Sequence, residues 1–170
     1  MSKSATTPAW INASILVGAG LFILALIVSA VFDPKIRALH VLQALIYIAV
    51  IVLTRKNSAW GFGAGCVIAA FWNYINLFVT TFVKAGLQQL SILLQTGQLH
   101  RPDLLIAVIA AGGHFLLIIA CLTGFFRMRP GAQQLGQFIA GGGLAVAYFV
   151  VIIITTGPQY IGLLKRVFRL

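Results

Sequence analysis

The stretch that decides the fold is LLIAVIAAGGHFLLIIACLTGFF, residues 104–126, in which no side chain is charged. An α-helix rises about 1.5 Å per residue, so roughly 20 apolar residues cross a hydrocarbon core ~30 Å thick. Lipid offers no partner to an open backbone, so such a run must be helical. The sequence therefore predicts an all-α polytopic membrane protein, a five-helix transmembrane bundle with spans at residues 11–32, 34–53, 60–83, 102–126 and 135–156.

The rest of the 170-residue chain is short and leaves no room for a soluble domain. We therefore expect a single transmembrane domain over residues 1–170. Residues 86–99 place four leucines on one helical face and glutamines on much of the rest, which is typical of an interfacial amphipathic helix. Residues 160–170 predict a basic amphipathic tail, with Leu164, Val167 and Phe168 toward lipid and Lys165, Arg166 and Arg169 toward phosphate.

The formal net charge of +10 is distributed along the helix ends and does not form a nucleic-acid surface. Basic side chains at these positions extend to the interface and meet anionic lipid headgroups, so the expected partner is the bilayer, with no nucleic acid. Side A is the membrane face at the start of the first span, and side B is the opposite face. Lysine and arginine counts determine orientation. They are higher on side B (Lys35, Arg37, Lys84, Arg101, Lys165, Arg166, Arg169) than on side A (Lys3, Arg55, Lys56, Arg127, Arg129).

This excess favours side B as cytoplasmic, with the N-terminus outside, in the bacterial inner membrane or an equivalent membrane.

The two acidic residues, Asp33 and Asp103, adjoin prolines at predicted helix starts, where a carboxylate caps free N–H groups. Cys66 and Cys121 fall inside spans without metal-ligand or redox spacing. No catalytic set, metal site or cofactor is therefore predicted.

Polar side chains inside the spans gather in the half of the bilayer toward side B. They recur at helical spacing on the second and third spans, and His114 lies at a similar depth on the fourth. We take them as candidate ligand-binding residues: His40, Gln43, Tyr47, Asn73, Asn76, Thr80, Lys84 and His114. Positions 75 and 79 lie off this stripe. Such an arrangement predicts a polar cavity that opens on side B and closes near Tyr47, Asn73 and His114.

Two other groups of residues have simpler structural explanations. Trp10, Trp60 and Tyr160 are expected to anchor the chain at the interfaces. Trp72 is expected to pack or face lipid, with a place in an aromatic pocket as the alternative. Glycines recur at residues 61–65, 112–113 and 141–143, where they would let helix backbones approach closely.

Two explanations of the polar residues remain open. They line a cavity, or they form hydrogen bonds between helices and have no ligand. Correspondingly, we consider two functions. The first is a small carrier or binding protein for a neutral or anionic small molecule or lipid headgroup. The second is a non-catalytic accessory subunit of a larger membrane complex. A carrier would stay folded alone or as a homo-oligomer, whereas an accessory subunit would co-purify with different chains.

Overall fold

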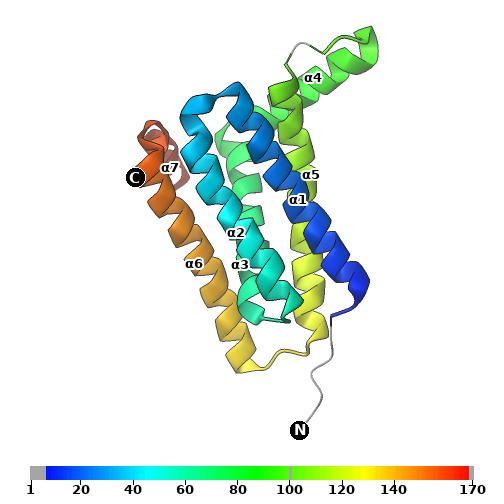
Figure 1. Cartoon of the computed structure of the whole chain (residues 1–170), viewed down its shortest axis with the longest axis vertical. Helices are drawn as coiled ribbons and strands as arrows, with labels where there is room; N and C mark the ends of the chain where they lie inside the picture. The colour runs from blue at the N-terminus through cyan, green and yellow to red at the C-terminus, as the bar shows by residue number, and fades with distance from the viewer. Residues whose placement is uncertain (1–6, 100, 169–170) are drawn as a thin grey trace.

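The computed structural model describes residues 7–99 and 101–168, which form helices joined by short turns (Figure 1). Among these residues, five helical segments are long and apolar enough to cross a membrane, which confirms the predicted all-α bundle. They are α1 (Ala9–Phe32), η1 with α2 (Pro34–Ile36 and Arg37–Arg55), α3 with the π-helical turn η2 (Ala59–Tyr74 and Ile75–Val79), α5 (Pro102–Arg127) and α6 (Ala132–Thr156).

In the described part of the chain, three shorter helices outside the five spans lie at the side-B end of the bundle, which is the upper end in Figure 1. They are α4 (Phe82–Thr96), the 3₁₀ turn η3 (Pro158–Tyr160) and α7 (Ile161–Phe168). Helix α4 extends away from the bundle after packing against the start of α5, whereas α7 lies beside the end of α6 (Figure 1). The central helix of the bundle is α3, which contacts α2, α5 and α6.

Glycines bring helix backbones into direct contact at two seams. The sequence predicted such contacts for Gly113 and Gly141. Between α1 and α5, a Cβ added at Gly18 would lie 2.7 Å from the Gly113 carbonyl oxygen. Between α3 and α6, a Cβ at Gly141 would lie 2.3 Å from the Trp60 carbonyl oxygen. Gly112 is different, because open space surrounds it.

The third span ends earlier than the sequence predicted. The π-helical turn closes with the Thr80 N–H donating to the Ile75 carbonyl at 2.8 Å, and Thr80 itself is extended, with φ −111° and ψ 178°. The Thr80 hydroxyl then accepts from the Phe82 N–H at 3.4 Å, which starts α4. A β-branched residue whose hydroxyl bonds the nearby backbone disfavours continuing the helix. The predicted continuous helix to Val83 is therefore wrong.

The two amphipathic segments are present with altered details. Helix α4 begins four residues before the predicted start, and it ends at Gly97, whose φ of +68° is the left-handed conformation common after a helix. In the C-terminal segment, Lys165 and Arg166 are exposed as expected. Leu164 is buried against the bundle, so the prediction that it faces lipid is wrong. Arg169 lies outside the described residues.

The two carboxylates differ in their local roles. Asp33 caps the turn η1, because its Oδ1 accepts from the Lys35 N–H at 3.1 Å. Asp103 lies in the first turn of α5, where an acidic side chain is favourable. Its carboxylate accepts two hydrogen bonds from the Arg101 guanidinium, at 2.8 Å from Nε and 2.6 Å from Nη2. The pairing with Arg101 was not foreseen.

Candidate functional site

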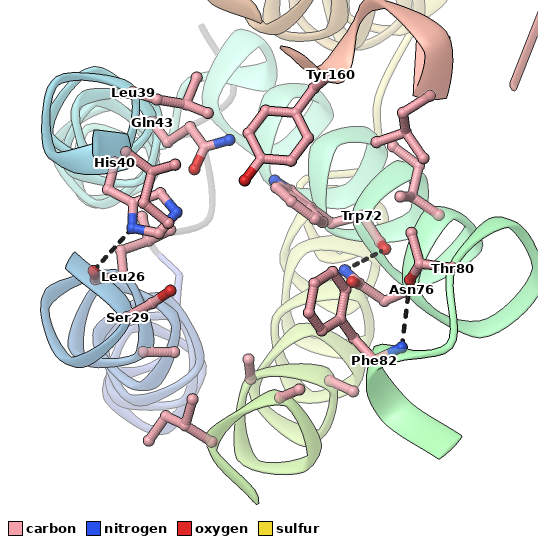
Figure 2. A pocket seen from close by; sticks show the side chains of 18 of the residues that line it. Leu26, Ser29, Leu39, His40, Gln43, Trp72, Asn76, Thr80, Phe82 and Tyr160 are labelled. Carbon is pink, nitrogen blue, oxygen red and sulfur yellow. Dashed lines mark hydrogen bonds between the residues drawn. The ribbon is translucent and has the colours of Figure 1, made fainter. Parts of the chain in front are cut away.

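A cavity of about 970 Å³ occupies the side-B half of the bundle. Its lining residues come from α1, α2, α3 with η2, α5 and α6, and η3 and α7 contribute others near the rim. Figure 2 shows the Tyr160 ring of η3 among these side chains. His114 lines its inner end, 12 residues after the start of α5. At 1.5 Å per residue this is about 18 Å from the side-B end of that helix. The cavity thus reaches approximately the middle of a bilayer.

The inner end is closed by a chain of three hydrogen-bonded side chains. The Tyr47 hydroxyl lies 2.8 Å from His114 Nε2, and His114 Nδ1 lies 3.3 Å from Asn73 Oδ1. Asn73 Nδ2 in turn donates to the Ala111 carbonyl at 3.5 Å. If the Tyr47 hydroxyl donates to Nε2, Nδ1–H donates to Asn73, so we assign this neutral tautomer from the network. These hydrogen bonds link α2, α5 and α3, and they are complete without a ligand.

An aromatic ring packs against this hydrogen-bonded group of side chains at the inner end of the cavity. The Phe22 ring of α1 lies with its centroid 4.1 Å from that of His114 and 4.5 Å from that of Tyr47. His114 is 1% exposed and Tyr47 is fully buried. Phe22, His114 and Tyr47 therefore form a packed cluster at the inner end of the cavity. This packing supports the interpretation of the polar residues as hydrogen-bonded contacts between helices.

Two polar atoms in the cavity wall differ from that chain because they lack partners. Gln43 is 1% exposed, and its Oε1 has no hydrogen-bond partner among the described residues. The indole Nε1 of Trp72 is also buried and unpaired. Figure 2 shows both side chains pointing into the same part of the cavity as the Tyr160 ring, which enters from η3. Buried polar atoms are normally paired, so these two call for an explanation.

The charged residues of the cavity wall lie at its rim and balance one another. They are two carboxylates, Asp33 and Asp103, and two guanidiniums, Arg101 and Arg166. Burial raises the pKa of the Tyr160 hydroxyl above its ordinary value of 10.0, and the Asp33 carboxylate acts in the same direction. Tyr160 is therefore neutral at neutral pH. The wall below the rim presents neutral polar groups between apolar side chains.

Six of the eight candidate residues line this cavity: His40, Gln43, Asn73, Asn76, Thr80 and His114. His40 Nδ1 also lies 3.0 Å from the Leu26 carbonyl, which connects α2 to α1. Tyr47 is not a lining residue, because it lies behind His114. Lys84 is exposed on α4 and does not line the cavity either. The predicted stripe is wrong at this point, because the chain leaves the third span before reaching Lys84.

The sequence did not identify several residues that line the cavity. Ile75 and Val79, predicted to lie off the polar stripe, are in its wall because the π-helical turn rotates the residues after Tyr74. Trp72 and Tyr160 also line it, although they were expected to pack or to anchor the chain. Helical periodicity does not distinguish an aromatic ring that faces a cavity from one that packs against other helices, and Tyr160 comes from a segment far along the chain.

A second hollow, of about 410 Å³, lies in the wall formed by α2, α3 and α6. Its lining is almost wholly apolar, and the hydroxyl of its one tyrosine, Tyr148, donates to the Leu42 carbonyl at 3.0 Å. This hollow fits an apolar chain, and apart from the indole N–H of Trp60 its lining side chains present no polar group without a hydrogen-bond partner. The cavity in the side-B half is therefore the candidate site.

No protein-family model, curated protein or solved structure matches this chain. Within residues 7–99 and 101–168, no three histidine, cysteine or acidic residues are grouped as metal ligands would be. The arrangement of neutral donors and acceptors around an apolar space is suited to holding a molecule.

Proposed function

We propose that this protein is a membrane-embedded binding protein that takes up a small molecule or lipid headgroup from side B. The observation that supports this most directly is the cavity of about 970 Å³ in the side-B half of the bundle. Ligand sites are typically concave, mostly apolar and roughly 300–1,000 Å³ in volume, with a few polar groups that fix orientation. The cavity has this volume and this mixture of side chains.

The closed inner end favours binding over conduction. The Tyr47–His114–Asn73 chain spans three helices at this level, and the backbones of Gly18 and Gly113 are in contact beside it. A ligand that enters from side B therefore has no open route to side A. Movement across the membrane, as in a carrier, would need a second conformation in which this seam is separated.

Thiol labelling tests this proposal in membranes of defined orientation. A cysteine at Asn76, in the cavity wall, is compared with one at Phe78, which is 77% exposed on the outer surface. Both variants carry Cys66→Ala and Cys121→Ala, so that no native thiol reacts. We expect a polar, membrane-impermeant maleimide to label Asn76→Cys from side B only and to leave Phe78→Cys unlabelled in lipid.

Two outcomes would refute the proposed function. If Asn76→Cys does not react from side B, the cavity is not accessible to water-soluble molecules. If it reacts equally from side A, the cavity is part of a continuous pore. The same experiment determines the orientation, for which we propose side B as cytoplasmic in a bacterial inner membrane or equivalent, with anionic headgroups at the basic helix ends. The lysine and arginine excess on side B supports this orientation.

An accessory subunit of a larger membrane complex is the second candidate, and helix α4 is the observation that favours it. One side of α4 packs on α5 at Gly86, where an added Cβ would lie 2.5 Å from the Leu104 carbonyl oxygen. Elsewhere α4 exposes large apolar side chains, with Leu94 78% and Leu87 50% exposed. These side chains would contact either lipid or another subunit. Purification in a mild detergent separates the two, because an accessory subunit carries different chains with it in fixed stoichiometry.

A further inference from the structure

The unpaired atoms of Gln43 and Trp72 define what a ligand of this cavity must provide. Oε1 of Gln43 only accepts hydrogen bonds, and the indole N–H of Trp72 only donates. Both atoms are buried without a partner among the described residues. Leaving a buried polar group unpaired is unfavourable, so each atom gains most from a ligand that completes it.

Gln43 Oε1 requires a donor and Trp72 Nε1 requires an acceptor, and these two requirements together restrict the ligand. Figure 2 shows the two side chains directed into the same part of the cavity, with the Tyr160 ring beside them. A group placed there must donate to Gln43 and accept from Trp72. A hydroxyl or a primary amide does both. A carboxylate only accepts, so it could pair with Trp72 Nε1 and with the Gln43 amide nitrogen but would leave Gln43 Oε1 unpaired. A quaternary ammonium group donates no conventional hydrogen bond and accepts none, so it would leave both atoms unpaired.

Charge disfavours the ions for a second, independent reason. The charged residues that line the cavity are at its rim, and the Arg101 guanidinium is already paired with Asp103. The one titratable side chain that α2 contributes to the wall near Gln43 is His40, whose Nδ1 already lies 3.0 Å from the Leu26 carbonyl. An ion held beside Gln43 would therefore leave water without a fixed counter-charge, and burying an unpaired ion is strongly unfavourable.

We infer that Gln43 and Trp72 form a selective subsite for an uncharged hydroxyl or primary amide group carried by an otherwise apolar molecule. The apolar part fits the neighbouring wall, where Leu26, Leu39 and Ile106 lie. This inference rests on the proposed binding function and makes its ligand class specific. Water also donates and accepts, but one water occupies roughly 30 Å³, so the cavity has room for a far larger occupant.

Binding is measured in lipid nanodiscs on a chain whose only tryptophan is Trp72, obtained with Trp10→Phe and Trp60→Phe. The probes share one decyl chain and differ in the polar end: 1-decanol, decanamide, decanoate and decyltrimethylammonium, with decane as the apolar reference. Each is compared at equal concentration in the bilayer. We expect decanol and decanamide to change the Trp72 emission in a saturable way, and the two ions and decane to produce no saturable change.

Gln43→Leu removes the acceptor while keeping the side-chain size close. We expect it to weaken decanol binding on the order of tenfold, because Trp72 then provides the only directed bond. The matched control is Gln89→Leu, since Gln89 also has a buried, unpaired Oε1 but lies on α4 outside the cavity wall. This control should bind decanol as the parent chain does.

A second measurement covers the case in which Gln43→Leu does not fold. Decanol should slow maleimide labelling of Asn76→Cys, and Trp72→Phe should reduce that protection. Three results would overturn the inference: equal decanol affinity in Gln43→Leu, equal binding of the ions, or no saturable effect of any probe, which would mean that only water occupies the subsite. If Asn76→Cys is labelled from side B but the probes show no preference, the subsite is wrong while the proposed binding function stands.

Discussion

Replacing Gly141 with alanine should loosen the seam between α3 and α6, whereas the same change at Gly143 should not. The added Cβ at position 141 lies 2.3 Å from the Trp60 carbonyl oxygen, and ordinary van der Waals contact begins at 3.4 Å. The two helices must therefore separate by about 1.1 Å along this contact. The obstacle is backbone, so no side-chain rotation relieves it. Around Gly143 there is nothing within 4 Å.

The size of the effect follows from two opposing terms. Overpacking of this kind typically costs about 1–3 kcal/mol. Alanine is favoured over glycine in a helix interior by up to ~1 kcal/mol, and this gain applies at both positions because both lie well inside α6. The difference between the variants thus isolates the clash, and we expect Gly141→Ala to unfold about 1–3 kcal/mol more easily than Gly143→Ala.

The measurement is reversible unfolding in mixed micelles, followed by far-ultraviolet circular dichroism as the denaturing detergent is increased. If the two variants differ by less than ~0.5 kcal/mol, the close approach of α3 and α6 is refuted. Gly113→Ala and Gly112→Ala repeat the comparison at the seam between α1 and α5. A Cβ at position 113 lies 2.9 Å from the Gly18 carbonyl oxygen, and one at position 112 lies in open space.

Three further outcomes are expected in the same unfolding assay. Tyr47→Phe should lower the free energy of unfolding by about 0.5–2 kcal/mol, because His114 Nε2 loses its partner, and a neutral effect would mean that the bond contributes nothing. Gly97→Ala should destabilise by ~1 kcal/mol, since φ is +68° there, and Gly97→Asn should be milder. Asp103→Asn should change stability little at physiological salt, because its partner Arg101 is exposed; a large loss would show that the pair is structurally essential.

The overall fold was predictable from the sequence because five apolar runs each have the length of a bilayer span. The half of the bilayer that holds the polar side chains was predictable for a related reason, since depth follows from the residue count within a helix. His40, Gln43 and His114 were placed in this way, and the structure puts all three in the cavity wall.

The full set of cavity-lining residues was not predictable, because assigning residues to one face by helical spacing requires an unbroken α-helix. The π-helical turn at residues 75–79 violates this assumption, so Ile75 enters the wall, and the chain turns away before Lys84. Tyr160 was missed for another reason. Its place in the wall depends on how η3 folds over the bundle, and that is a tertiary contact which no local pattern encodes.

The closed inner end has a consequence for how this protein would be loaded in a cell. Beside His114, the backbones of Gly18 and Gly113 are in contact, so a ligand bound as proposed would be reached from side B and not from side A in this conformation. Occupancy would then follow the concentration of ligand in the side-B leaflet and solution alone. A concentration difference across the membrane would neither fill nor empty the cavity, and release would have to be driven by events on side B.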